Sequence, residues 1–186
     1  SAAYASRVKG DRAENIEKAL EICQQSLLVR TKLGMPIEWA KTMLSMANIY
    51  SIRIKGERLD NIDNAIDAYQ LSLEVFRPEQ LPRECRRAAK SLGSLYSEKE
   101  CWSEAAKAYQ LALEAAEVID QASLFLKTQE SELEVTSDLF RQAAYAFAKA
   151  GNLQSALTTL EEGRAQGLSE VLERENVKLS TLEQIA

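Results

Sequence analysis

The stretch SLGSLYSEKECWSEAAKAYQLALE, residues 91–114, predicts the fold because it contains two short helical patterns separated by a turn. The first pattern places three residues on one helical face, Leu92, Gly93 and Tyr96. The second pattern has the contact spacing of another helix, with Ala105, Tyr109 and Ala112. Residues three or four positions apart share a helical face, so each set predicts one packed helix. Gly93 and Ala105 let the two helices approach closely, and the tyrosines fill the space beside them.

These residue types at these positions resemble the tetratricopeptide repeat (TPR), a helix-turn-helix unit of about 34 residues. With Leu92 at position 7, six of the eight signature positions agree, and the exceptions are Ala89 in place of Trp and Glu117 in place of Pro. The resemblance implies an all-α fold, an α-α superhelix (TPR solenoid) of antiparallel helix pairs. We expect about 3 to 4 repeats with lengthened helices.

The composition agrees with a helical protein. Of 186 residues only 7 are Gly and 3 are Pro, and strong helix formers dominate the rest. A formal net charge of -5 disfavours nucleic-acid binding. The longest apolar run, residues 143–148, is far shorter than the roughly 20 residues that cross a bilayer. We therefore expect neither nucleic acid nor membrane among the partners.

The sequence offers no catalytic or cofactor chemistry. Its three cysteines, Cys23, Cys85 and Cys101, lack CxxC spacing, and there is no His to complete a metal site or to activate a thiol. Paired carboxylates such as Glu161 with Glu162 are interpreted as solvated surface charges, because no partner group for acid–base chemistry accompanies them. We predict a protein that is not an enzyme, that binds no cofactor or metal, and whose reduced cysteines place it in the cytoplasm.

Shifting the sequence by 46 residues against itself shows a second repetition. Gly10, Asn15, Ile16, Ala19 and Ser26 match Gly56, Asn61, Ile62, Ala65 and Ser72, and Pro36 and Tyr50 match Pro82 and Tyr96. Because this period exceeds the usual repeat of about 34 residues, we assign the extra residues to the connectors around 53–60 and 76–82. Gly56 can take a left-handed conformation there, and Pro78 and Pro82 can end one helix and begin the next.

The periodicity predicts helices over residues 12–33, 37–54, 60–77, 83–99, 102–126, 131–150 and 152–174. Two long helices are expected to meet near 126–131, and the end of a truncated first helix is expected before Val8. In the last unit the contact positions are Ala143, Ala144, Phe147, Ala156 and Leu160. The predicted organisation is a TPR-like domain over residues 1–175, and a tail or start of a linker to a further domain over 176–186, which we expect to fray.

Two segments resemble a particular class of TPR protein. Residues 9–16 and 55–62 share the pattern Lys-Gly-(Asp/Glu)-Arg-x-(Glu/Asp)-Asn-Ile, and residues 161–172 follow Glu-x-Gly-Arg-Ala-x-x-Leu-x-Glu-x-Leu. Both are similar to the TPR regions of bacterial CHAT proteins, whose repeats precede a caspase-like protease domain. The resemblance implies a protease domain beyond Ala186. No catalytic residue is carried over, because this sequence has no His.

In TPR arrays the inner groove is lined by first-helix residues that point away from the second helix. The matching positions give a candidate peptide-binding groove: Lys41, Asn48, Arg87, Lys90, Ser94, Arg141, Tyr145 and Lys149, with Leu44 on the same face. Five of these are basic, against the acidic Glu98 and Asp138, which favours an acidic peptide or a terminal carboxylate as partner. The competing interpretation is a set of ordinary solvated charges.

The two tryptophans, Trp39 and Trp102, stand where helices begin and are interpreted as packing residues. The function predicted from the sequence is a non-catalytic scaffold that binds a protein or peptide partner in its concave groove. The alternative is the sensor or regulatory region of a larger CHAT-type protease.

Overall fold

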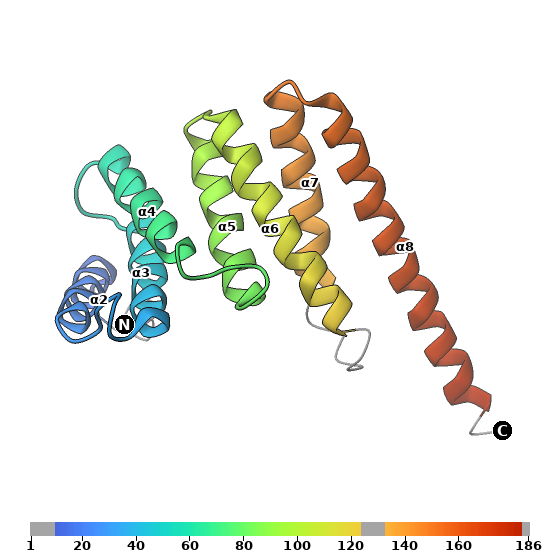
Figure 1. Ribbon diagram of the computed structural model, residues 1–186, viewed down its shortest axis with the longest axis horizontal. Coiled ribbons are helices and arrows are strands. Elements are labelled where there is room, and N and C mark those ends of the chain that lie inside the picture. The colour runs from blue at the N-terminus through green and yellow to red at the C-terminus, as the bar shows by residue number, and fades with distance from the viewer. Residues whose placement is uncertain (1–9, 124–132, 184–186) are drawn as a thin grey trace.

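The computed structural model describes residues 10–123 and 133–183. Within these ranges the protein forms seven α-helices and no strand, which confirms the predicted all-α class. The helices are α2 (Arg12–Leu27), α3 (Pro36–Ser51), α4 (Arg58–Leu73), α5 (Pro82–Glu98), α6 (Trp102–Ser123), α7 (Leu133–Lys149) and α8 (Leu153–Glu183). Figure 1 shows them in a curved row with α2 at one end and α8 at the other.

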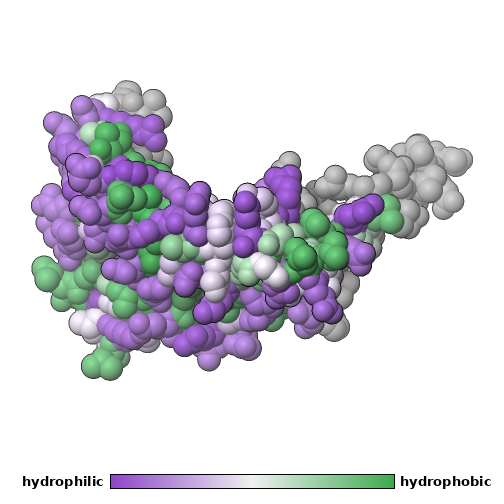
Figure 2. Space-filling view, turned by 90° about the horizontal axis from the view of Figure 1, so that it is seen from above, coloured by the Kyte–Doolittle hydropathy of each residue, from purple (hydrophilic) through white to green (hydrophobic). Residues whose placement is uncertain are grey.

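The helices pack in pairs, α3 with α4, α5 with α6 and α7 with α8. We call each pair a unit, with a first and a second helix. The second helix of one unit also packs on the first helix of the next, α4 on α5 and α6 on α7. Stacking in which each unit contacts only its neighbours builds a superhelix, as predicted. Figure 2 shows the resulting curved body, whose upper edge is hollowed.

The 46-residue repeat of the sequence also appears in the positions where helices begin. Arg12 begins α2 and Arg58 begins α4, whereas Pro36 begins α3 and Pro82 begins α5. The residues before the two prolines also share a backbone conformation, with φ -142° and ψ 64° at Met35 and φ -136° and ψ 61° at Leu81. Proline fits the first helical turn because its φ is fixed and its missing N–H would have had no partner there. The repeat therefore includes the helix starts as well as the helices.

A buried amide holds the connector between α3 and α4. Gly56 has φ +82°, in the left-handed region that glycine adopts without a Cβ penalty, as predicted. Asn61, 2% exposed, donates from Nδ2 to the Lys55 carbonyl at 2.9 Å and accepts through Oδ1 from Arg53 Nη1 at 3.3 Å. A buried amide without such bonds would destabilise the fold, which explains why a polar residue can occupy this position.

The predicted close approach of the two helices in the unit α5/α6 is confirmed. A Cβ atom added at Gly93 would lie 3.0 Å from the ring of Tyr109, and Ala105 is completely buried. In the last unit, however, Leu160 does not occupy a buried contact position, because it is 43% exposed. Leu160 is exposed because no later helix packs over α8 within the described residues, whereas α7 packs on the second helix α6.

The helices α2 and α4 end clearly earlier than predicted. α2 ends at Leu27 and α4 at Leu73, rather than near 33 and 77, because the following residues turn instead of continuing the helix. After α2 the apolar side chains have no surface to pack on, and Leu33 is 99% exposed. After α4, in contrast, Phe76 turns back into the core and is fully buried.

The last helix is longer than predicted. α8 continues to Glu183, beyond the expected end near Arg174, because helix-forming residues without Gly or Pro follow Gly167. The predictions of a truncated first helix before Val8 and of a helix junction near 126–131 lie outside the described residues.

Candidate functional site

The eight residues predicted to line a groove all lie on first helices. We call them the first-helix face: Lys41 and Asn48 on α3, Arg87, Lys90 and Ser94 on α5, and Arg141, Tyr145 and Lys149 on α7. All are exposed except Lys90, which is half-buried. The face is therefore accessible along three successive units.

Leu44 does not belong to this face. The sequence spacing placed it in the groove, but its side chain is 2% exposed and lies in the main core cluster. The prediction was wrong because this position faces the interior of the stack. Leu44 lies in the core cluster with Ala40 and Ala47, and the equivalent Lys90, 46 residues later, is the one half-buried residue of the first-helix face.

Asp138 joins two of the predicted cations. Its carboxylate accepts from Lys90 Nζ at 3.1 Å, which links α5 to α7, and it also pairs with Arg141 on its own helix. The hydrogen bond from Lys90, helped by the nearby Arg141 charge, holds the pKa of the Asp138 carboxyl below its usual range. Asp138 is therefore ionised at neutral pH and offsets part of the positive charge of this surface.

Tyr145 and Lys149 form a small aromatic cluster with Trp102 of α6. The Trp102 and Tyr145 rings meet edge to face with centroids 5.6 Å apart, and Lys149 Nζ lies 5.6 Å from each ring centroid. An ammonium group at this distance is attracted by the ring quadrupole. The half-buried Trp102 and the buried Trp39, 9% exposed, thus both contribute to packing, as predicted.

The remaining residues of the first-helix face are less connected. Lys41 pairs with Glu38 one turn earlier at 3.2 Å. Asn48 accepts through Oδ1 from the hydroxyl of Tyr69 on α4, at 2.6 Å. Arg87 and Ser94 are exposed. An incoming peptide would meet amide and hydroxyl groups as well as charges here.

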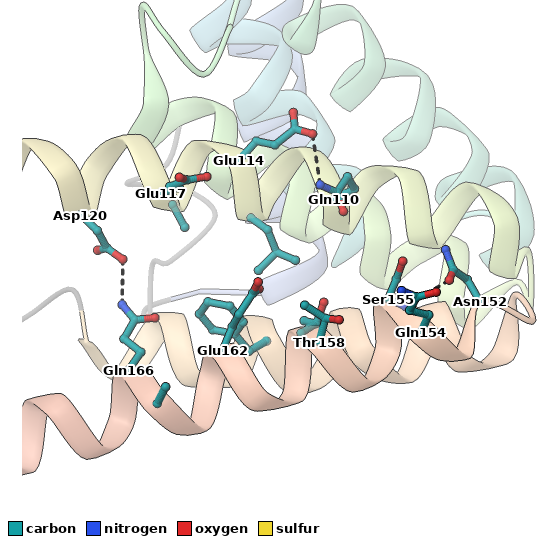
Figure 3. Close-up of a pocket in the computed structure, with 15 residues that line it drawn as sticks. Gln110, Glu114, Glu117, Asp120, Asn152, Gln154, Ser155, Thr158, Glu162 and Gln166 are labelled. Atoms are coloured by element: carbon teal, nitrogen blue, oxygen red, sulfur yellow. Dashed lines mark hydrogen bonds between the residues drawn. The ribbon is translucent and has the colours of Figure 1, made fainter.

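A cleft lies between the second helices α6 and α8, and the sequence did not predict it. It is a cleft of about 720 Å³ whose floor includes Leu113 of α6 and Phe140 of α7. Figure 3 shows its labelled side chains along both helices, with the Gln166–Asp120 hydrogen bond crossing it. That bond, from Gln166 Nε2 to Asp120 Oδ2, is 2.8 Å long. We call this feature the α6–α8 cleft.

The lining of the α6–α8 cleft is acidic. It contains the carboxylates Glu114, Glu117, Asp120 and Glu162 and no Lys or Arg. Amides and hydroxyls fill the positions between them, including Gln110, Gln154 and Thr158. The signal in the sequence was a polar stripe at helical spacing on each helix, but only the packing of α6 and α8 on α7 shows that the two stripes face one cleft.

The described residues provide few groups for catalysis. Burial raises the pKa of the Cys85 thiol to about 11, so this thiol is protonated at neutral pH. Cys23 is buried as well, and the cysteines at 23, 85 and 101 are free. Among residues 10–122 and 138–168, whose side chains the structure describes, no three His, Cys, Asp or Glu side chains lie close enough to share a metal ion. Within the described helices, none is both long and apolar enough for a transmembrane span.

Comparison with known proteins gives matches in structure alone. No family model matches the sequence, and no curated protein does. Among solved structures, the chain is similar to BtubC (BKLC) from P. vanneervenii, with a TM-score of 0.45, 14% identity, and coverage of 86% of this chain and 78% of BtubC. It is also similar to the MamA protein, with a TM-score of 0.44, 14% identity, and coverage of 84% and 75%. A further MamA structure has a TM-score of 0.40 and 12% identity, and the match covers 88% of this chain and 99% of that MamA chain.

Proposed function

We propose that this protein is a non-catalytic scaffold that binds a protein or peptide partner on the first-helix face. The observation that carries the proposal is the exposure of seven of its eight predicted residues, which come from α3, α5 and α7. A repetitive surface built from successive units suits an extended partner, because each unit can contact a different part of it.

The charges of the face favour an acidic partner. Arg87 and Lys149 have no carboxylate partner among the described contacts, and Lys90 and Arg141 share the single carboxylate of Asp138. Net positive charge remains after this pairing, and it would attract and orient an acidic segment. Binding is proposed to involve protein alone, without nucleic acid or membrane, and in the cytoplasm.

The test begins with a pull-down from cell extract, read by mass spectrometry, to identify the partner. The double variant Lys90→Glu with Arg141→Glu should then weaken the affinity for that partner by about tenfold or more, since like charges would face it. The matched control, Lys18→Glu with Lys107→Glu, makes the same charge change at exposed positions of α2 and α6. Unchanged binding by the first variant would refute the assignment of this face.

Asp138→Asn provides the opposite change. It removes the carboxylate that Lys90 and Arg141 share, and should therefore strengthen the binding of an acidic partner. Weaker binding by this variant would mean that the partner is basic, and unchanged binding would mean that it binds elsewhere.

A second candidate function rests on the sequence resemblance of residues 161–172 to the segment that precedes CHAT domains. On this alternative the protein is the sensor or regulatory region of a larger caspase-like protease, and the scaffold holds substrate or activator for it. Sequencing the gene beyond Ala186 tests this alternative. A stop codon directly after Ala186 would exclude it and leave the scaffold proposal unaffected.

A further inference from the structure

The α6–α8 cleft and the first-helix face lie on opposite sides of α7. Phe140 in the cleft floor follows Asp138 by two residues, which turns its side chain by about 200° around the helix axis. Arg141 and Tyr145, at helical spacing from Asp138, remain on the side of Asp138. A molecule in the cleft would therefore not contact the first-helix face.

The two surfaces also differ in how their charges are balanced. On the first-helix face a carboxylate is paired with cations, as Asp138 is with Lys90 at 3.1 Å. In the cleft, Glu114 and Glu117 accept hydrogen bonds from the neutral amides of Gln110 at 3.2 Å and Gln121 at 3.1 Å. Amide bonds do not cancel the carboxylate charges, so the cleft presents net negative charge.

The spacing of these carboxylates limits what the cleft can bind. Among the described residues no three of them are close enough to hold a metal ion together. They are instead distributed along the cleft, on both walls, from Glu114 and Glu117 on α6 to Glu162 on α8. Anionic ligands such as nucleic acids and lipid head groups would be repelled. A molecule with several separated positive charges complements this arrangement.

The shape of the cleft fits a short extended peptide. Along α8 the lining runs from Asn152 to Gln166, which is about 21 Å at the helical rise. An extended peptide spans that distance with about six residues. Gly163 brings α8 onto α7, since a Cβ there would lie 2.6 Å from Phe140 Cβ, and this close approach closes the floor.

We infer that the α6–α8 cleft binds an extended basic segment of about six residues from a protein partner. Lysine or arginine side chains of the segment pair with Glu114, Glu117 and Glu162, and an apolar side chain rests on Leu113 and Phe140. Exposed side-chain amides such as that of Gln154 hydrogen-bond its backbone. This is a second docking surface on the scaffold, and it does not depend on an acidic partner at the first-helix face.

Fluorescence polarisation with two labelled hexapeptides tests the inference directly. The basic probe is acetyl-Lys-Leu-Lys-Leu-Lys-Leu, and the acidic probe replaces each Lys with Glu, so both have the same apolar content. The full protein should bind the basic probe saturably, and more weakly as salt is raised. In the variant Lys90→Glu with Arg141→Glu, whose first-helix face no longer attracts acidic peptides, the basic probe should still bind and the acidic one should not. No binding of the basic probe, or equal binding of both probes by this variant, would refute the inference.

Two sets of variants locate the binding. Glu114→Gln, Glu117→Gln and Glu162→Gln together should raise the Kd for the basic probe by about tenfold. The matched control makes the same three-charge change at exposed positions outside the cleft, Glu79→Gln, Glu104→Gln and Glu161→Gln, and should leave the Kd nearly unchanged. An equal loss in both sets would show a general charge effect and overturn the assignment to the cleft.

A third variant fills the cleft without removing a carboxylate. Thr158 is exposed on its α8 wall, and Thr158→Arg should place an internal guanidinium among the carboxylates and compete with the probe. Circular dichroism confirms that each variant is folded. Lys90→Glu with Arg141→Glu should leave probe binding intact, so the failure of one docking surface is distinguishable from the failure of the other.

Discussion

The units α3/α4 and α5/α6 make the same helix contact with different residues. In α5/α6 the ring of Tyr109 lies against Gly93, where an added Cβ would be 3.0 Å away. In α3/α4 the equivalent residues are Tyr69 and Ala47, both buried, so this contact accommodates a methyl group. Both units have a tyrosine at this position of the second helix. The residue opposite the tyrosine, Gly or Ala, reflects how closely the two helices of the unit approach each other.

The connectors of the two units differ as well. Residues 52–57 join α3 to α4, whereas only residues 99–101 join α5 to α6. α4 also begins earlier than α6 relative to the shared contact positions, Ala65 and Ala105. The added turn brings Arg58 to Glu98 at the end of α5, with Nη2 and Oε1 3.0 Å apart. The insertion thus provides a contact with the next unit.

Both units, in contrast, share an ion pair with the helix that precedes them. Glu17 of α2 binds Arg53 through two hydrogen bonds of 2.8 Å, and Asp63 of α4 pairs with Lys99. The two pairs are 46 residues apart in the sequence. One joins α2 to the residues that follow α3, and the other joins α4 to the residues that follow α5, so the repeat preserves a contact between each of these helices and the unit that follows it.

The largest expected effect comes from filling the closer contact. Gly93→Val places three carbon atoms against the ring of Tyr109, which is 2% exposed and cannot move aside. We expect the free energy of unfolding to fall by about 3 kcal/mol, measured by circular dichroism in urea. Gly167→Ala is the control, because nothing lies within 4 Å of its added Cβ, and it should stabilise α8 by up to about 1 kcal/mol. If Gly93→Val lowered the free energy of unfolding by less than about 1 kcal/mol, the helices of α5/α6 would be no closer together than those of α3/α4.

A smaller effect of opposite sign is expected in the turns. The connector of α3/α4 uses Gly56 at φ +82°, whereas the turn of α5/α6 has Glu100 at φ 56°, where a side chain is strained. Glu100→Gly should therefore raise the free energy of unfolding by about 1 kcal/mol. Gly151→Ala in the turn of α7/α8, at φ +85° with open space around it, should lower it by a similar amount. Effects of the same sign in these two variants would contradict the role of the left-handed conformation.

The smallest effect concerns the shared ion pair and depends on pH. The hydrogen bond from Arg53 lowers the pKa of the Glu17 carboxyl below its unfolded value, so its stabilisation is present above the unfolded pKa and is lost as pH falls through the folded pKa. Glu17→Gln should lower the unfolding free energy by about 0.5 kcal/mol at neutral pH, with the difference vanishing in acid. Thermal melts across this pH range measure it, with Glu21→Gln on the same helix as control. A difference that persists in acid would contradict the ion-pair account.

Much of the repeat could be predicted from local residue types. Pro36 and Pro82 mark helix starts, and Gly56 marks the connector, because these residues restrict or extend backbone conformations without reference to distant parts of the sequence. Helix ends were less predictable. Leu28 follows α2 and Phe76 follows shortly after α4, but only Phe76 is buried. Burial depends on what lies opposite, which periodicity does not contain.

Of the two candidate surfaces, the sequence predicted the first-helix face but not the α6–α8 cleft. The positions of the first-helix face follow from the spacing along α3, α5 and α7. Leu44 has the same spacing but packs in the core cluster, because its position faces the interior of the stack. The α6–α8 cleft was not predicted, since its walls are separated by about 46 residues, as Asp120 and Gln166 are. Each wall alone resembles an ordinary solvated helix face.

Residue types and their spacing were enough to predict the helical class, the paired units and the 46-residue repeat with its glycine and proline positions. These depend on residue spacing and on backbone restrictions that act over a few residues. Only the packing of the helices shows which charges are neutralised, as at Asp138, and which ones line a cleft that has no Lys or Arg among its described lining residues, as do Glu114 and Glu162. Charge balance is set by distances of a few ångströms between helices, and those distances are fixed only when the units stack.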